Sequence, residues 1–292
     1  RVRSRKMDNI LEEVRNFSKA GYKEIVLTGI HLSSYGVDFL DESYNKRMEY
    51  ITRNEESDEE FVTKNELLDL IKNIAAIPGI ERVRIGSLEP RIIKEAFVKK
   101  LSEIKEFCPH FHLSLQSGCD RTLKNMNRKY TAGEFLKGVK LIRKYFESPA
   151  ITTDIIVGFP GESEEDFREC EDFVRQVGFY ETHIFPYSVR EGTRAATLPQ
   201  TDGSIKAMRA NILNEINLKN QHEFRKSRIG KADEILCEEI YIKDEVRYFT
   251  GYTKEYVRIA VPEGDYKTND FVRGKIIGFL TDSILLMETK AL

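Results

Sequence analysis

Tryptophan and paired cysteine motifs are both absent from this chain of 292 residues. Its four cysteines are scattered without CxxC or CxxxCxxC spacing, so no zinc ribbon or iron–sulfur loop is encoded in them. No apolar run approaches the roughly 20 residues that cross a bilayer, and the first residues lack the apolar stretch of a secretory signal. We therefore expect no metal ligand in this chain, a cytoplasmic location and no membrane partner.

A large net charge is missing as well, since the formal value is −2, but the charges are unevenly distributed. Residues 38–60 carry nine acidic and three basic side chains, and we expect the segment 38–62 to be a solvated surface insertion. Residues 205–231 carry seven basic and two acidic side chains on an amphipathic pattern. This basic stretch is either a solvated helix face or a surface that follows a phosphate backbone.

The stretch from Ile151 to Ser163 has the pattern of one strand, one turn and the start of a helix. Its β-branched and apolar first half predicts a buried strand. The turn contains Gly158, and Ser163 with Asp166 resembles a capping box. Asp154 is the only charged residue of the strand. Asp154 either caps a neighbouring turn or faces a ligand.

Helix and strand patterns alternate from residue 7 to residue 226. Helices are expected over 7–20, 63–77, 91–104, 131–146, 163–177 and 203–226, and strands over 24–29, 83–87, 111–116, 151–157 and 181–187. This order predicts a parallel sheet in a βα barrel or a doubly wound fold, and the helix in first place indicates that a first strand is missing. Glycine or small polar residues follow each strand, at the edge where such folds bind ligands.

Five short strand patterns separated by turns occupy the last sixty residues and predict a small closed β-barrel. The expected domains are therefore residues 1–226 and 227–292. Barrels of this size often bind nucleic acid, and Tyr248, Phe249, Tyr252 and Tyr256 are expected to be exposed beside basic residues. Residues 232–292 carry twelve acidic and eight basic side chains, which weakens that argument. The alternative is an inert cap on the main domain.

Several motifs follow one another in a specific order. They are RVRSR at 1–5, IVLTGIHLSSYG at 25–36, SLEP at 87–90, CPHFHLSLQSG at 108–118, MNRKYT at 126–131, TDIIVGFPGE at 153–162, HIFPYS at 183–188 and REGT at 190–193. Together they resemble the radical S-adenosylmethionine (SAM) methylthiotransferases. Within that family, TGIHLSSYG and SLEP are similar to the group that acts on threonylcarbamoyladenosine next to the tRNA anticodon. The C-terminal barrel resembles the RNA-binding TRAM module.

The resemblance implies a partial βα barrel of the radical SAM type followed by a TRAM-like β-barrel. It also implies methylthiolation at C2 of N6-threonylcarbamoyladenosine, with SAM and two 4Fe–4S clusters in the full-length family. There, a CxxxCxxC loop lies just upstream of the segment matched by residues 1–5, and an earlier domain supplies three more cysteines. The cluster cysteines are therefore expected upstream of Arg1. We expect an N-terminally truncated fragment that binds no cluster and is inactive as given.

The resemblance also implies site residues. The expected cofactor-binding residues are Thr28, Gly29, Ile30, Ser87, Gln116, Ser117, Arg128, Asp154 and Gly158. The expected substrate- or RNA-binding residues are His31, Arg225, Lys226, Arg228, Arg247 and Arg258. No catalytic residue is assigned. His110 and His112 are expected on opposite sides of their strand.

The expected partners are the tRNA anticodon stem–loop and an electron donor such as flavodoxin or ferredoxin, and we expect a monomer. One alternative is a sibling methylthiotransferase that acts on isopentenyladenosine tRNA or on a ribosomal protein. A second is a different βα-barrel enzyme without a cluster, although the sequence contains no acid–base pair or nucleophile motif for one. A third is a non-catalytic RNA-binding fragment.

Overall fold

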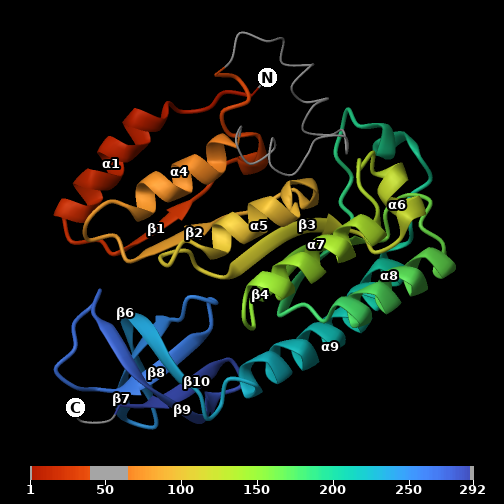
Figure 1. Ribbon diagram of the computed structural model, residues 1–292. Coiled ribbons are helices and arrows are strands. Elements are labelled where there is room, and N and C mark those ends of the chain that lie inside the picture. The colour runs from red at the N-terminus through yellow and green to blue at the C-terminus, as the bar shows by residue number, and fades with distance from the viewer. Residues whose placement is uncertain (1, 40–64, 290–292) are drawn as a thin grey trace.

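Five parallel strands in sequence order form the main part of the protein, whose computed structural model describes residues 2–39 and 65–289 (Figure 1). They are β1 (Glu24–Leu27), β2 (Arg82–Ile85), β3 (His110–Gln116), β4 (Ala150–Val157) and β5 (Glu181–Pro186). β1 pairs with β2, and β3, β4 and β5 pair in that order. Isolated parallel bridges from Val83 to Phe107 and from Leu88 to Leu113 connect the two sheets. The predicted α/β fold with parallel strands is confirmed.

The helices of the described residues lie within the segments that the sequence predicts, with one exception. They are α1 (Met7–Lys19), α4 (Glu66–Ala75), α5 (Glu95–Ser102), α6 (Asp120–Asn125), α7 (Ala132–Tyr145), α8 (Glu164–Val177) and α9 (Gly203–Lys226), with 3-10 turns η1 (Leu32–Ser34), η2 (Pro90–Ile92) and η3 (Arg194–Thr197). The predicted capping box at Ser163 of α8 forms, and a second capping box forms at Thr131 of α7. α4 is capped by Asn65, which accepts from the Leu68 N–H at 3.0 Å. α6 was not predicted, because six residues are too few to show a helical period.

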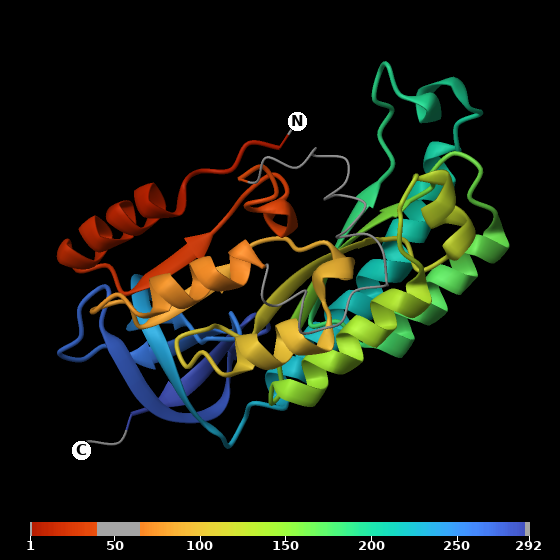
Figure 2. The same cartoon turned by 45° about the horizontal axis from the view of Figure 1, so that its top comes forward.

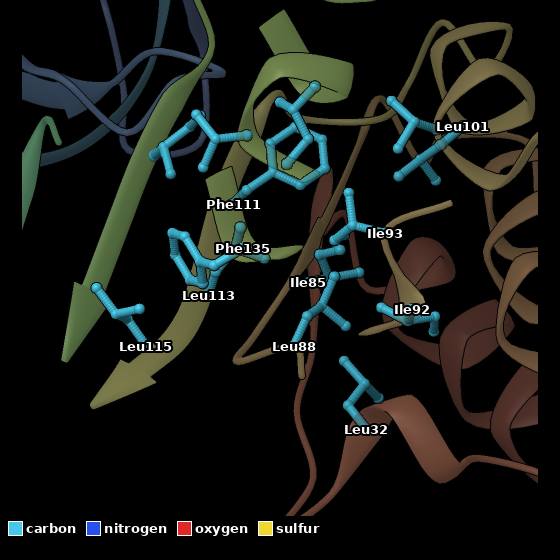
Figure 3. Close-up of a cluster of buried hydrophobic side chains, with 14 of the residues drawn as sticks. Leu32, Ile85, Leu88, Ile92, Ile93, Leu101, Phe111, Leu113, Leu115 and Phe135 are labelled. Carbon is cyan, nitrogen blue, oxygen red and sulfur yellow. The ribbon is translucent and has the colours of Figure 1, made fainter. Parts of the chain in front are cut away.

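One face of the sheet carries the hydrophobic core. Phe111, Leu113 and Leu115 alternate along β3 and pack with Phe135 of α7 (Figure 3). The alternate residues of β3 point to the opposite face, because side chains change sides at every residue of a strand. The expectation that His110 and His112 lie on opposite sides of β3 is therefore wrong: they are two residues apart and share one face.

The five C-terminal strands close into a barrel in the order β10-β8-β7-β6-β9. Their bounds are β6 (Ala232–Lys243), β7 (Val246–Tyr252), β8 (Arg258–Pro262), β9 (Phe271–Thr281) and β10 (Ile284–Glu288). Phe249 lies in the barrel core rather than at the surface. Tyr256 stacks on Tyr252, with 4.3 Å between ring centroids, and on His110 of the sheet, at 5.2 Å. These rings therefore help to join the barrel to the sheet.

Helix α9 leads from the end of the sheet to the barrel, which lies beside β1 and β2 (Figure 2). The predicted basic helix is thus confirmed in its extent, 203–226. Its buried side includes Arg209, Leu213 and Ile216. Within the described ranges, no helix is long and apolar enough to span a membrane.

Two of the sequence predictions fall on parts of the chain that the structure does not describe. The acidic insertion predicted at 38–62 lies outside the described residues, except for its first two positions. Arg1, upstream of which the cluster cysteines are expected, lies outside them as well. The placement of those cysteines therefore stays a prediction.

Candidate functional site

The carboxyl ends of the parallel strands meet along one edge. Leu27 lies opposite Ile85 in the register, and the Gly86 N–H donates to the Leu27 carbonyl at 2.8 Å. Beyond β4 and β5 the edge opens into a cleft of about 1460 Å³, whose walls include Arg128, Phe159, Phe185 and Tyr187. The edge therefore brings together strand ends that are far apart in the sequence, as parallel folds require of a ligand site.

The segment Thr28–Ile30 after β1 is solvent-exposed, with Ile30 fully so. A Cβ atom at Gly29 would have no neighbour closer than 3.8 Å, which is ordinary van der Waals contact. Neither backbone geometry nor packing therefore demands a glycine at position 29. A ligand lying against the backbone would supply a reason for one. Ser87, at the end of the adjacent β2, is also exposed.

Gln116 and Ser117 end β3 in different ways. Gln116 has a left-handed φ of +73° at an irregularity in the pairing with β4. Such a conformation is costly for a residue other than glycine and is found most often at functional sites. Ser117 is fully buried, and its hydroxyl accepts from the Cys119 N–H at 3.2 Å. The structure thus gives Ser117 a role inside the fold rather than at the exposed edge.

The backbone conformation and the packing of the protein itself require a glycine at position 158, after β4. Its φ is +70°, and a Cβ there would lie 2.5 Å from Cγ of Lys206 on α9. The Gly158 N–H donates to Glu162 Oε2 at 2.6 Å. Lys206 therefore covers this glycine, which the resemblance implied to bind the cofactor.

His31 forms a polar cluster with Ser34 and with Glu89 of the SLEP motif. Its Nδ1 lies 2.6 Å from Ser34 Oγ, and its Nε2 lies 3.2 Å from Glu89 Oε2. The hydrogen bond with Glu89 is the main reason that the pKa of His31 is raised above 6.5. Glu89 also accepts from Arg91 Nε at 2.6 Å. Sequence reasoning missed Glu89, although the motif it belongs to was identified.

We expect the Glu89→Gln variant to bring the pKa of His31 back toward 6.5, because the neutral amide removes the main cause of the shift. In the native chain the raised pKa of His31 means that its contact with Glu89 stabilises the fold below about pH 6.5 and is lost as the pH rises through the raised value. At low pH the contact is lost again when Glu89, whose pKa is lowered, becomes protonated. NMR titration of the His31 ring protons measures the pKa of His31 in the native chain and in the variant. The exposed Glu103→Gln serves as the control, and an unchanged titration in Glu89→Gln would contradict the assignment.

Asp154 lies on the face of the sheet opposite to the hydrophobic core. Its Oδ2 is 3.1 Å from His112 Nε2 on β3, and His183 of β5 is opposite Asp154 in the register. Burial raises the pKa of Asp154, but the hydrogen bond from His112 and the charges of both histidines outweigh it, so the net shift is downward. The alternative that Asp154 caps a turn is not what the structure shows.

The basic residues expected to bind RNA have varied surroundings. Arg228 is buried, and its Nη2 lies 2.7 Å from Asp233 and 3.0 Å from Glu255, so it stabilises the fold rather than offering a free cation. Arg225 donates to the Asp282 carbonyl and to Gln221. Arg247 pairs with Glu263 and Arg258 with Glu239, whereas Lys226 is exposed.

Three exposed arginines line the cleft: Arg128, Arg190 and Arg194. No carboxylate of residues 2–39 or 65–289 forms an ion pair with any of them. Sequence reasoning missed Arg190 and Arg194 as site residues, although Arg190 starts the REGT motif. The cleft thus joins positive charge to the exposed ring of Phe185, a combination suited to an anionic ligand with a planar group.

The edge fits SAM better than it fits an iron–sulfur cluster. The open backbone at Gly29 and the exposed Ser87 leave room for a small polar ligand. All four cysteines are buried, and burial raises the pKa of Cys108 and Cys237 to about 11. Within the described ranges, none of them belongs to a group of three possible metal ligands. These cysteines therefore do not fit a cluster.

Comparison with known proteins gives one family and several relatives. The family model of the radical SAM superfamily matches residues 1–174. Threonylcarbamoyladenosine tRNA methylthiotransferase MtaB of Bacillus subtilis is 33% identical over 279 residues, covering 94% of this chain and 56% of that protein. The MtaB protein of Thermotoga maritima is 34% identical over 259 residues, covering 88% and 54%.

A second type of relative is equally similar. The tRNA-2-methylthio-N(6)-dimethylallyladenosine synthase of Acetivibrio thermocellus is 36% identical over 255 residues, covering 87% of this chain and 48% of that protein. The chain spans about half the length of the curated relatives it matches. Sequence identity therefore does not separate the two substrate types.

Proposed function

Because the chain belongs to the radical SAM superfamily and its curated relatives are tRNA methylthiotransferases, we propose that it serves methylthiolation at C2 of N6-threonylcarbamoyladenosine next to the tRNA anticodon. The observation that carries the proposal is the cleft at the carboxyl edge of the sheet, with three exposed arginines and no carboxylate paired with them among the described residues. SAM, when bound, would supply the methyl group and the radical that removes the C2 hydrogen.

The arginines favour threonylcarbamoyladenosine over dimethylallyladenosine as the substrate. A threonylcarbamoyl group ends in a carboxylate, which a guanidinium can grip with two hydrogen bonds. A dimethylallyl group has no charge, so it would leave the same guanidinium groups without a partner in the complex. Specificity of this kind depends on unpaired polar groups as much as on new contacts. Phosphates of the anticodon loop would be further partners for these cations.

The residues of the edge have separate tasks in this proposal. Thr28, Gly29 and Ile30 offer free backbone groups to the methionine part of SAM, and Ser87 and Gln116 supply neutral hydrogen bonds. Arg128 holds the carboxylate of the threonylcarbamoyl group. The C-terminal barrel and Lys226 extend the RNA-binding surface, as a TRAM-like module would. An electron donor such as flavodoxin or ferredoxin, a cytoplasmic location and a monomeric state complete the proposal.

We expect an anticodon stem–loop that carries threonylcarbamoyladenosine to bind roughly tenfold more tightly than the same RNA with dimethylallyladenosine. A hydrogen bond to a charged group contributes about 1.5–3 kcal/mol, which is enough for that ratio. The triple variant Arg128→Gln, Arg190→Gln and Arg194→Gln should lose the preference. Fluorescence anisotropy of labelled RNA measures the affinities, at one fixed salt concentration.

Arg168→Gln is the matched control, because Arg168 is an exposed arginine of α8 that pairs with Glu164. Equal affinity for the two RNAs would refute the choice of substrate.

Equilibrium binding of SAM to the same protein tests the alternative functions. RNA binding without SAM binding would favour a non-catalytic RNA-binding role. SAM binding without RNA binding would favour a different βα-barrel enzyme.

A further inference from the structure

Three potential metal ligands lie at one level of the sheet, on the face opposite to the hydrophobic core. His112 comes from β3, Asp154 from β4 and His183 from β5, and their ligand atoms all lie within 4.8 Å of one another. The register explains the grouping. His112 is opposite Thr152, Asp154 is two residues further along β4 on the same face, and His183 is opposite Asp154. Adjacent strands hold side chains rigidly, which favours a precise site.

From this grouping we infer that His112, Asp154 and His183 form a binding site for a divalent transition-metal ion such as Zn²⁺. Two imidazole nitrogens and one carboxylate oxygen suit Zn²⁺ and similar ions, whereas Mg²⁺ and Ca²⁺ take oxygen ligands. The site goes beyond the proposed function, which requires no ion here.

The distances agree with a shared ion. His112 Nε2 and Asp154 Oδ2 are 3.1 Å apart, and two ligand atoms of a tetrahedral zinc site are separated by about 3.3 Å when the bonds are about 2.0 Å long. The rings of His112 and His183 have centroids 5.6 Å apart and are tilted by 33°. Because His183 is exposed, rotation of its side chain can bring a ring nitrogen to the ion.

The surroundings orient the first ligand. His112 Nδ1 lies 2.9 Å from the hydroxyl of Thr152, which is only 2% exposed. In the metal-bound tautomer the proton sits on Nδ1, which donates to this hydroxyl, and the Nε2 lone pair points to the ion in place of the Nε2–H that otherwise donates to Asp154. Metal-binding histidines usually donate their second ring N–H to an oxygen in this way.

The site is open on one side. The side chains of His112 and Asp154 are 14% and 29% exposed, and His183 is exposed. Three protein ligands with access from solvent leave at least one coordination position free, which is the arrangement of catalytic rather than structural zinc sites. The sequence prediction of no metal ligand considered spacing along the chain only, and these three residues are separated by 42 and 29 positions.

Zinc binding to the whole chain tests the inference, by equilibrium dialysis with Zn²⁺ alone and by the visible absorption of added Co²⁺. We expect one ion per chain, and at least a hundredfold weaker binding in His112→Ala and in Asp154→Asn. Thr152→Val, which removes only the orienting hydroxyl, should weaken binding about 10- to 100-fold. The assay needs neither SAM nor RNA, so its result is independent of the proposed function.

His222→Ala is the control, since His222 is exposed on α9 and stacks on Phe279. It should bind zinc as the native chain does. Absence of bound zinc in the native chain would overturn the inference, as would unchanged binding in His112→Ala and Asp154→Asn. Loss of binding in His31→Ala alone would place the ion at His31 and Glu89 and would overturn it too.

Discussion

The Arg209→Ala variant is expected to lose about 3–5 kcal/mol of unfolding free energy, because it leaves a buried carboxylate without its counter-ion. Arg209 Nη1 lies 2.6 Å from Glu162 Oε2, and the two side chains are 4% and 1% exposed. Glu162 also accepts from the Gly158 N–H at 2.6 Å. Burial raises the pKa of Glu162 despite that hydrogen bond and the nearby Arg209, so removal of Arg209 leaves the charge still less favourable.

Urea denaturation of the native chain and the variant measures the loss. Arg168→Ala on the exposed face of α8 is the control, and we expect it to cost about 0.5 kcal/mol or less, as surface pairs do. The double variant Arg209→Met with Glu162→Gln should recover part of the loss, because no charge then remains buried and the amide still accepts from Gly158. A loss below about 1 kcal/mol in Arg209→Ala would show that the pair is not a major contribution to stability.

The Arg209–Glu162 ion pair also supports one wall of the cleft at the carboxyl edge of the sheet. Glu162 follows directly on Phe159, Pro160 and Gly161, which form part of the cleft wall. The Gly158 N–H and Arg209 on α9 hold Glu162 from two sides. An intact ion pair therefore fixes this wall relative to helix α9.

The second large effect is expected in Arg84→Ala, at about 3–5 kcal/mol. Arg84 is a buried residue of β2 that donates from Nε to Glu24 at 2.8 Å, and to the barrel carbonyls of Lys254 and Thr253 at 2.8 and 3.2 Å. Its guanidinium also lies over the ring of Tyr256, 4.7 Å from the centroid. The substitution would leave Glu24 with a weaker counter-charge and two barrel carbonyls without this donor.

Arg82 makes the corresponding contacts two residues earlier on the same face of β2. It donates to the carbonyls of Tyr252 and Glu234 at 2.7 and 2.9 Å and lies over the ring of Phe271. Two buried guanidinium groups thus connect the sheet to the barrel. We therefore expect Arg84→Ala to speed proteolytic cleavage between the sheet and the barrel, in addition to lowering the midpoint of denaturation.

Arg273→Ala is the matched control for this interface. Arg273 pairs with Glu234 as Arg82 does, but its side chain is 83% exposed. We expect a change below about 1 kcal/mol and no change in proteolysis. If Arg84→Ala resembled this control in both measurements, the buried contacts would not be what holds the barrel in place.

Much of the local structure was predictable from the sequence. Thr131 with Glu134, and Ser163 with Asp166, form the two capping boxes, because the residues that cap a helix end lie within one turn of it. The five strands of the sheet and the five of the barrel follow from short-range hydrophobic patterns. α6 was missed, because a six-residue segment is too short to show a helical period.

The site was predictable only in outline. The strand ends were correctly expected to converge, since parallel strands end at a common edge. The ion pairs that bury Arg228 could not be predicted, because Glu255 approaches Arg228 from a distant loop of the barrel. Ser117 and Gly158 follow their strands as ligand-binding residues do, yet Cys119 and Lys206 occupy their surroundings.

The sequence by itself determined the alternation of helices and strands, the division into an α/β part and a β part, and the motifs by which the family was identified. Those features depend on neighbours within a few residues. Only the tertiary structure decided which charged groups are buried and paired, such as Arg84 and Arg209, and which remain open at the cleft, such as Arg128. It alone placed His112, Asp154 and His183 together, because strand register brings into contact residues whose distance along the chain carries no such information.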